Sequence, residues 1–261
     1  MFVAQALPDN EVTMLAGSSK DKNYSLSPIE IPIQRLMEHS YTILDSEHSV
    51  LLHINHHAGD NTHYGYGNIY VSDSTGIRYT NSLQGNIKSI HGQCDFEKVH
   101  GVEGVYLANI YDKSALKSLK STNANAFPYQ HTGGKKGSEY WNGATDMNSA
   151  LNSDDVKKRS INDYKKTVIS FDKGGIWQPL TPPYKDSNGK RIICESDEGC
   201  ALHLHSISSN FNFGPMFTTA NSLGLILGTG NVGPYLSNRL DEVNTYLSRD
   251  AGLTWFEVKM H

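Results

Sequence analysis

The chain has 261 residues, 19% of them charged, and a formal net charge of -4 at pH 7. This charge provides no strongly basic surface, so we expect no nucleic-acid partner. No run of about 18 apolar residues occurs, and the N-terminal residues lack the basic start and apolar core of a secretory signal, so we expect neither a membrane span nor a signal in this chain.

The sequence is typical of many short strands joined by tight turns. Aromatic residues make up 10% of the chain and there are 23 glycines. Helical signals are scarce: the stretch 27–37 contains two prolines, which favour extended chain. Apolar stretches that we expect to be strands occur in pairs along the chain, at 50–54 and 68–71, 104–110 and 166–169, and 224–228 and 244–247.

An eight-residue pattern follows the second stretch of each pair. Ser-x-Asp-x-Gly-x-x-Trp is complete at 170–177 and 248–255, and a degenerate copy at 72–79 has Ser74 at the Asp position and Tyr79 at the Trp position. A hydroxyl and a carboxylate two residues apart can bond the amides of a tight turn, the glycine allows a positive φ, and the aromatic ring returns to the core. We call each copy an Asp-box turn. Its residues are expected to be structural and not catalytic: Ser170, Asp172, Gly174 and Trp177 in one turn, and Ser248, Asp250, Gly252 and Trp255 in the other.

The repeating unit of strand, loop, strand, Asp-box turn and strand predicts an all-β fold, a partial Asp-box (BNR-like) β-propeller of about three blades. The turns start 98 and 78 residues apart, which exceeds the roughly 40–50 residues of an ordinary blade. The blades must therefore carry insertions. The stretch 112–163 is rich in Ser, Asn, Lys and Gly and shows no periodicity, so we expect a flexible insertion there within one propeller domain that covers 1–261.

Other chemistries find less support in the sequence. His203 and His205 lie two apart on an expected strand, but zinc needs three or four converging ligands, so no metal and no cofactor is expected. A sialidase-like glycoside hydrolase is the enzymatic alternative; it requires an arginine cluster, and of the six arginines two lie in Asp-box turns and one in the insertion. The run Gly228–Gly233 spells G-x-G-x-x-G outside a βαβ unit, and we interpret it as a loop between strands. A truncated propeller fragment that binds nothing, or that forms a homodimer through its open blade faces, is the further alternative.

Three cysteines are present, and Cys194 and Cys200 are close enough in sequence to form a small disulfide ring that leaves Cys94 unpaired. The tripeptide Asn23-Tyr24-Ser25 is an N-glycosylation acceptor sequence. Both features are typical of an oxidising, luminal compartment.

Three stretches resemble the sortilin, or vacuolar-protein-sorting-ten, domain. They are the hairpin 67–83; the segment 95–106 with its continuation at 169–177; and Cys200-Ala-Leu-His-Leu-His205 with 224–233 and 247–255. The resemblance implies a ten-bladed ring that binds protein or peptide cargo in the lumen of the Golgi and endosomes, for transport to endosomes or the vacuole. It also implies a single-span type I parent receptor with no enzymatic activity, and it supports the pairing of Cys194 with Cys200.

The resemblance places the ligand-binding segment at Asp95–Tyr106, with Phe96, Glu103 and Tyr106 as candidate contacts. In animal sortilins the position that matches Glu103 is typically an arginine, which captures the terminal carboxylate of a peptide. A glutamate repels such a group. If the site is present, this departure predicts a preference for basic or internal segments; the alternative is that Glu103 is a solvated loop residue without a ligand.

Overall fold

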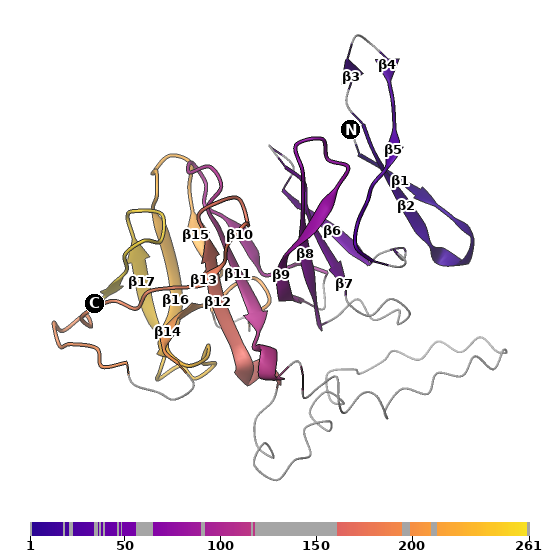
Figure 1. Ribbon diagram of the computed structural model, residues 1–261. Helices are drawn as coiled ribbons and strands as arrows, with labels where there is room; N and C mark the ends of the chain where they lie inside the picture. Colours follow the sequence, from indigo (N-terminus) through magenta and orange to yellow (C-terminus); the bar gives the residue numbers. More distant parts are fainter. Residues whose placement is uncertain are drawn as a thin grey trace, which may run out of the picture.

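The computed structural model describes residues 2–17, 19–20, 23–33, 36, 38, 40–45, 47, 49–55, 65–89, 92–115, 117, 161–194, 199–209 and 213–259. For residues 2, 19–20, 23–24 and 161–162 it describes the backbone alone. The described chain is built of antiparallel strands that form a row of sheets from the N-terminal to the C-terminal end (Figure 1). The all-β prediction is confirmed.

The N-terminal part forms a small sheet in the order β1-β2-β5, with β1 at Phe2–Ala6, β2 at Val12–Ala16 and β5 at Ser27–Pro28. A short helical turn, η1 at Pro8–Asn10, joins β1 to β2. The two-residue strands β3 (Ser19–Lys20) and β4 (Asn23–Tyr24) pair with each other. The extended chain expected over 27–37 is present at 27–31, where Glu30 forms a bridge with Arg78; the chain bends at 32–33, and residues 34, 35 and 37 lie outside the described residues.

Two four-stranded meanders follow, and each ends with the strand after an Asp-box turn. The first blade consists of β6 (Tyr41–Asp45), β7 (Leu51–Asn55), β8 (Gly65–Ser72) and β9 (Tyr79–Lys88). The second consists of β10 (Phe96–Lys98), β11 (Tyr106–Tyr111), β12 (Lys165–Ser170) and β13 (Gln178–Pro179), with the helical turn η3 (Ile161–Tyr164) before β12. The blades meet at the pair Ile110 and Asn86, which links β11 to β9.

The third blade has the order β14-β16-β17-β18, with β14 at Ala201–Leu204, β16 at Ile226–Gly233, β17 at Asn244–Ser248 and β18 at Phe256–Val258. A short strand, β15 (Phe217–Thr218), also pairs with β16. Because β14 pairs with the second half of β16 and β15 with the first half, the two together occupy the place of one interrupted strand.

The run Gly228–Gly233 lies inside strand β16, so the prediction of a loop there is wrong. The glycines serve close packing: a Cβ at Gly230 would overlap the backbone of His203 on β14, and one at Gly228 would press on Met216 and Leu204 at 3.3 and 3.4 Å. Glycine within a strand therefore marks a close approach between neighbouring strands here, as strand glycines often do.

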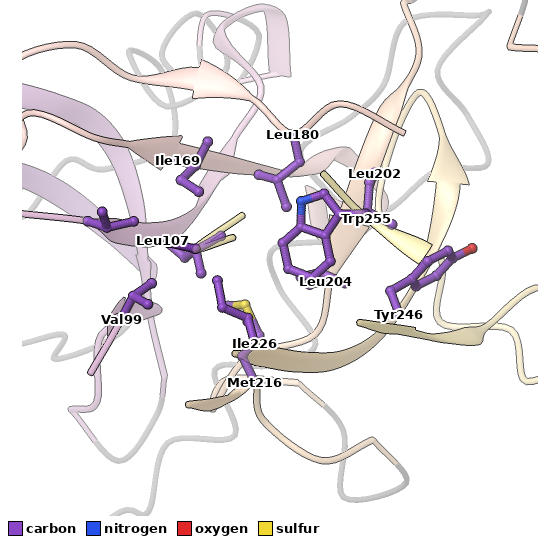
Figure 2. Packing of buried hydrophobic residues seen from close by; sticks show 12 residues of the cluster. Val99, Leu107, Ile169, Leu180, Leu202, Leu204, Met216, Ile226, Tyr246 and Trp255 are labelled. Atoms are coloured by element: carbon purple, nitrogen blue, oxygen red, sulfur yellow. The ribbon is translucent and has the colours of Figure 1, made fainter. Parts of the chain in front are cut away.

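The hydrophobic core lies between successive sheets. Val12 and Met14 of the N-terminal sheet pack with the first blade, and Leu51 and Ile69 of the first blade pack with the second. The largest cluster joins the second and third blades, and Figure 2 shows the Trp255 indole beside Leu180 and Leu202 within it. Each sheet thus buries an apolar face against the next.

The central strands of the first two blades are buried on both faces, whereas that of the third blade is not. All four residues Leu51–Ile54 of β7 are buried, as are Tyr106–Asn109 of β11. On β16 buried and exposed residues alternate at the start of the strand, although Leu225, Ile226 and Leu227 are all apolar. A continuous apolar run is typical of a strand covered on both sides.

Candidate functional site

The two complete Asp-box turns have the same hydrogen-bond pattern. Ser170 Oγ accepts the Gly174 N–H at 2.9 Å, and Asp172 Oδ1 accepts the Ile176 N–H at 2.8 Å and the Ser170 hydroxyl at 2.8 Å. In the other turn the corresponding acceptors are Ser248 Oγ and Asp250 Oδ1, at 2.8 and 2.9 Å from the Gly252 and Thr254 nitrogens. The carboxylates are therefore occupied by their own turns.

Each turn also packs onto the preceding blade. The Trp177 indole N–H donates to Ser82 Oγ on β9 at 3.0 Å, and a Cβ at Gly252 would lie 2.5 Å from the Ile169 side chain on β12. Gly174 and Gly252 have φ of 86° and 94°. The glycine therefore meets two demands at once, a left-handed backbone and a close contact between blades.

The two aromatic rings differ in burial. Trp255 is 4% exposed and belongs to the core between the second and third blades, whereas Trp177 is partly buried at the edge of the preceding core. The residue before each glycine, Lys173 or Ala251, also has a positive φ, at 62° and 61°. The turn thus needs two left-handed residues, of which the sequence pattern reveals one.

The degenerate turn uses a different carboxylate from the one that the pattern predicts. Asp73 Oδ1, and not the Ser74 side chain, accepts the Thr75 N–H at 3.0 Å and the Thr75 hydroxyl at 2.6 Å. Ser72 Oγ accepts the Val50 N–H at 2.8 Å, a bond to the neighbouring strand. A shift of the carboxylate by one position along the chain therefore preserves the capping of the turn.

Phe96 and Tyr106, two of the residues that the family resemblance indicates, form an aromatic pair with ring centroids 5.0 Å apart. Tyr106 is 4% exposed, and its hydroxyl donates to Asp45 Oδ2 of the first blade at 2.7 Å. Lys98 Nζ lies 3.5 Å from Asp45 Oδ2 and 2.6 Å from Glu47 Oε2. We call these five residues the junction cluster, because they join the first blade to the second.

Glu103 lies in the turn between β10 and β11, and its carboxylate pairs with Lys173 Nζ of the adjacent Asp-box turn at 2.5 Å. Both side chains are about half exposed, at 55% and 46%. Burial raises the pKa of the Tyr106 hydroxyl, and the charges of Asp45, Glu47 and Glu103 raise it further. Glu103 thus acts on the junction cluster through its charge, but its ion pair is with Lys173, which is not part of the cluster.

A buried polar seam crosses the blades next to this cluster. Asn86 Nδ2 on β9 donates to the carbonyls of Asp95 and Asn109, at 2.8 and 3.0 Å. Thr167 Oγ1 donates to Asn109 Oδ1 at 2.7 Å and accepts the Leu204 N–H of the third blade at 2.8 Å. These side chains connect three blades without exposure to solvent.

Asp95 anchors the third blade to this seam. Its carboxylate accepts the Ser208 N–H at 2.8 Å and the Ser208 hydroxyl at 2.5 Å. Burial raises the pKa of Asp95, against the effect of these bonds and of Lys165, and burial lowers the pKa of Lys165. Glu97 lies on β10, two residues after Asp95, and its pKa is raised to about 7 by burial and by the Asp95 charge. Sequence reasoning missed the seam.

A family model described as Sortilin-Vps10 (sortilin, neurotensin receptor 3) matches residues 1–127 and 136–261. The chain belongs to the Sortilin-Vps10 family. The unmatched residues 128–135 fall inside the predicted insertion, which itself stays a prediction because 118–160 lie outside the described residues.

Curated relatives of this Sortilin-Vps10 chain include vacuolar protein sorting/targeting protein 10 of Aspergillus fumigatus, 32% identical over 99% of this chain and 15% of the relative. The proteins of the same name from Paracoccidioides brasiliensis and Arthroderma gypseum are 32% and 34% identical over 88% and 85% of this chain, and 13% and 12% of their own lengths. The chain spans about one seventh or less of these relatives. A solved structure of a Dyadobacter fermentans protein of unknown function covers 84% of this chain and 53% of its own, at 14% identity and a TM-score of 0.29.

The family membership and the antiparallel blades identify the fold as a partial β-propeller. Cys194 and Cys200 form a disulfide, and Cys94 is a buried free thiol. Asn23, the glycosylation candidate, lies in β4, of which the structure describes the backbone alone. No helix in the described part of the chain has the length and apolarity to cross a membrane.

The residues considered for metal or sialic-acid chemistry have other contacts. His203 and His205 bond to Gly233 and to Ser209, and among the described residues no three His, Cys, Asp or Glu side chains gather as metal ligands. Arg78 pairs with Glu30 and Arg239 with Asp241, in loops of different blades. The arrangement of these two arginines does not favour the glycoside hydrolase alternative.

Proposed function

We propose that this chain is a cargo-binding segment in the luminal part of a sorting receptor that carries proteins from the Golgi to endosomes or the vacuole. The observation that carries the proposal is the match to relatives named for vacuolar protein sorting and targeting, over nearly the whole chain. A single-span parent receptor and a luminal location belong to the same proposal. The Asp-box carboxylates are occupied by their own turns, which supports a structural and not a catalytic role for Asp172 and Asp250.

The ligand site that we propose lies where Glu103 meets the junction cluster. Glu103 and Glu47 are exposed at 55% and 64%, and each pairs with a lysine that is itself more than one fifth exposed. A basic cargo side chain would compete with Lys173 for Glu103 and with Lys98 for Glu47. Phe96 and Tyr106 would support the site from below without a direct polar contact to the ligand, because Tyr106 is buried and its hydroxyl is bonded to Asp45.

The binding test compares two short peptides, one carrying internal Lys and Arg residues and one carrying Gln in their place, by fluorescence anisotropy. We expect the 261-residue chain to prefer the basic peptide and Glu103→Gln to weaken its binding about fivefold, the size of a loss of about 1 kcal/mol. Glu242→Gln, which removes an exposed, ion-paired carboxylate from the third blade, is the matched control. Equal affinity of both peptides for the wild-type chain would refute the ligand site.

We also propose that the isolated chain associates into homodimers through the outer face of the third blade. The register places Phe217, Leu227, Leu247 and Phe256 in one row across β15, β16, β17 and β18. Phe217 and Phe256 are each 56% exposed and Leu227 is 39% exposed. Sedimentation velocity tests this: Leu227→Asp should shift the chain to monomer, and a wild-type chain that stays monomeric at high concentration would contradict it.

A further inference from the structure

A closed hairpin projects from the chain between β13 and β14. The Ile192 N–H donates to the Tyr184 carbonyl at 3.1 Å, and Lys185 pairs with Arg191 in an antiparallel bridge. Asp186 Oδ1 accepts the N–H groups of Asn188 and Lys190 at 2.9 and 2.8 Å, which fixes the turn. We call residues 184–193 the basic hairpin; they have no part in the junction cluster.

The hairpin is held against the last strand of the third blade. Ser187 donates from its N–H and from its hydroxyl to Glu257 Oε1, at 3.3 and 3.0 Å. Lys259 Nζ lies 3.5 Å from Asn188 Oδ1, so a cation from the end of the chain joins the hairpin. In Figure 1 the orange segment that leaves β13 runs beside the C-terminus, in agreement with these contacts.

The hairpin concentrates positive charge on a chain of net charge -4. Lys185 and Arg191 stand directly opposite each other, and like charges in that position destabilise a pair of strands. Lys190 and Lys259 add two further exposed cations. In the described part of the chain, which leaves out the acidic stretch 195–198, none of the four has a carboxylate within ion-pair distance. The nearby carboxylates of Asp186 and Glu257 are bonded to the turn and to Ser187.

Apolar surface accompanies these cations. Tyr184 is 66% exposed and Ile193 is 73% exposed. The Arg191 guanidinium lies 5.4 Å from the centre of the Tyr184 ring, so the ring orients the guanidinium without neutralising it. A guanidinium held in this way can donate two parallel hydrogen bonds to a carboxylate.

We propose that the basic hairpin is a docking surface for an acidic, extended segment of a partner protein. The carboxylates of that segment would lie between Lys185 and Arg191 and relieve their repulsion, and its apolar side chains would cover Tyr184 and Ile193. A segment can place its charges on the cations alone, whereas an anionic membrane surface would also face Asp186 and Glu257. This surface is separate from the proposed cargo site: it prefers acidic ligands, whereas the cargo site prefers basic ones.

Fluorescence anisotropy with the full 261-residue chain tests the docking surface. The probe is a short, end-blocked peptide of alternating Glu and Leu, and the comparison peptide has Gln in place of Glu. We expect binding of the Glu peptide, a loss of at least about tenfold in affinity for the double variant Lys185→Glu/Arg191→Glu, and weaker binding at high salt. The double variant Lys113→Glu/Lys117→Glu has the same change in charge at exposed positions elsewhere and should bind within about twofold of wild type.

The single variant Lys185→Glu separates loss of binding from loss of folding. It creates an opposite-charge pair with Arg191, so its unfolding midpoint should equal or exceed that of wild type while its affinity for the Glu peptide falls. The proposal is overturned if both double variants bind equally well, or if the Gln peptide binds as tightly as the Glu peptide. Binding to phosphatidylserine vesicles that depends on Lys185 and Arg191, without binding to the peptide, would also overturn it in favour of a lipid headgroup.

Discussion

His203 should make the free energy of unfolding fall as the pH is lowered. The ring is 1% exposed, and its Nδ1 accepts the Thr167 N–H of the second blade at 3.0 Å. Nε2 therefore carries the proton and donates it to the Gly233 carbonyl at 3.1 Å. Protonation of Nδ1 would set two donors against each other between the second and third blades.

The size of the effect follows from the pKa of His203, which burial lowers to about 4, and from its ordinary value near 6.5 in the unfolded chain. As the pH falls below about 6.5 the unfolded chain binds a proton that the folded chain does not, so stability is lost from there down to about pH 4. At about pH 5 the loss amounts to about 2 kcal/mol relative to about pH 7.5. Above about pH 6.5 the full contribution is present.

The assay is urea unfolding at about pH 7.5 and about pH 5, on the wild-type chain and on His203→Gln. Glutamine keeps a donor and an acceptor and does not titrate, so the difference in unfolding free energy between the two pH values should be about 2 kcal/mol smaller in the variant. The pH dependence of the wild-type chain alone does not test the role of His203, because the ionisation of Glu97 changes the unfolding free energy in the opposite direction. If the unfolding free energy changes equally between the two pH values in both proteins, the reasoning is refuted, whatever the absolute stability of the variant.

Three further predictions concern stability and use the same unfolding assay. Glu97→Gln should raise the free energy of unfolding at about pH 7.5 by about 1–2 kcal/mol. The pKa of Glu97 is raised to about 7, so its ionisation makes the folded chain less stable as the pH rises from about 4.5 to 7. An unchanged free energy of unfolding at neutral pH would contradict this. Gly230→Ala should cost at least about 3 kcal/mol, since its Cβ would overlap the His203 backbone, and a cost below about 1 kcal/mol would show that β14 and β16 move apart freely. Asp250→Ala should cost about 1–2 kcal/mol through loss of its bonds to Thr254 and Ser248, with Lys113→Ala as an exposed control of no effect.

The repeat was readable from the sequence because it combines a turn with special backbone demands and strands of continuous apolar character. Ser170, Asp172 and Gly174 are needed together by one turn, so their spacing predicts its location. The apolar stretches at 50–54 and 104–110 correspond to β7 and β11, which lie under sheets on both sides. Local chemistry and burial pointed to the same elements, and such elements are the ones that sequence reasoning identifies.

The buried polar seam could not be predicted in the same way. Asn86, Asn109 and Thr167 occupy strand positions that a sequence reader assigns to solvent, because a polar residue on a strand is usually exposed. The bonds that cross between blades join distant residues: Asn86 reaches Asn109, 23 residues away, and Asn109 reaches Leu204, 95 residues away. The basic hairpin, in contrast, had a readable signal: Asp186-Ser-Asn-Gly189 contains the Asn-Gly step that favours a tight hairpin turn.

The seam and the apolar clusters make different contributions to the arrangement of the blades. A fully buried aliphatic side chain such as Leu107 or Leu204 contributes roughly 1.5–3 kcal/mol, but it packs against any apolar face of suitable shape. A buried hydrogen bond contributes less, yet a wrong neighbour would leave its donor or acceptor unpaired at a cost of about 1–3 kcal/mol. Because Asn109 Nδ2 and Thr167 Oγ1 meet the Leu204 backbone specifically, the seam determines the register in which the third blade joins the second. The apolar faces then supply most of the free energy that holds the blades in that register.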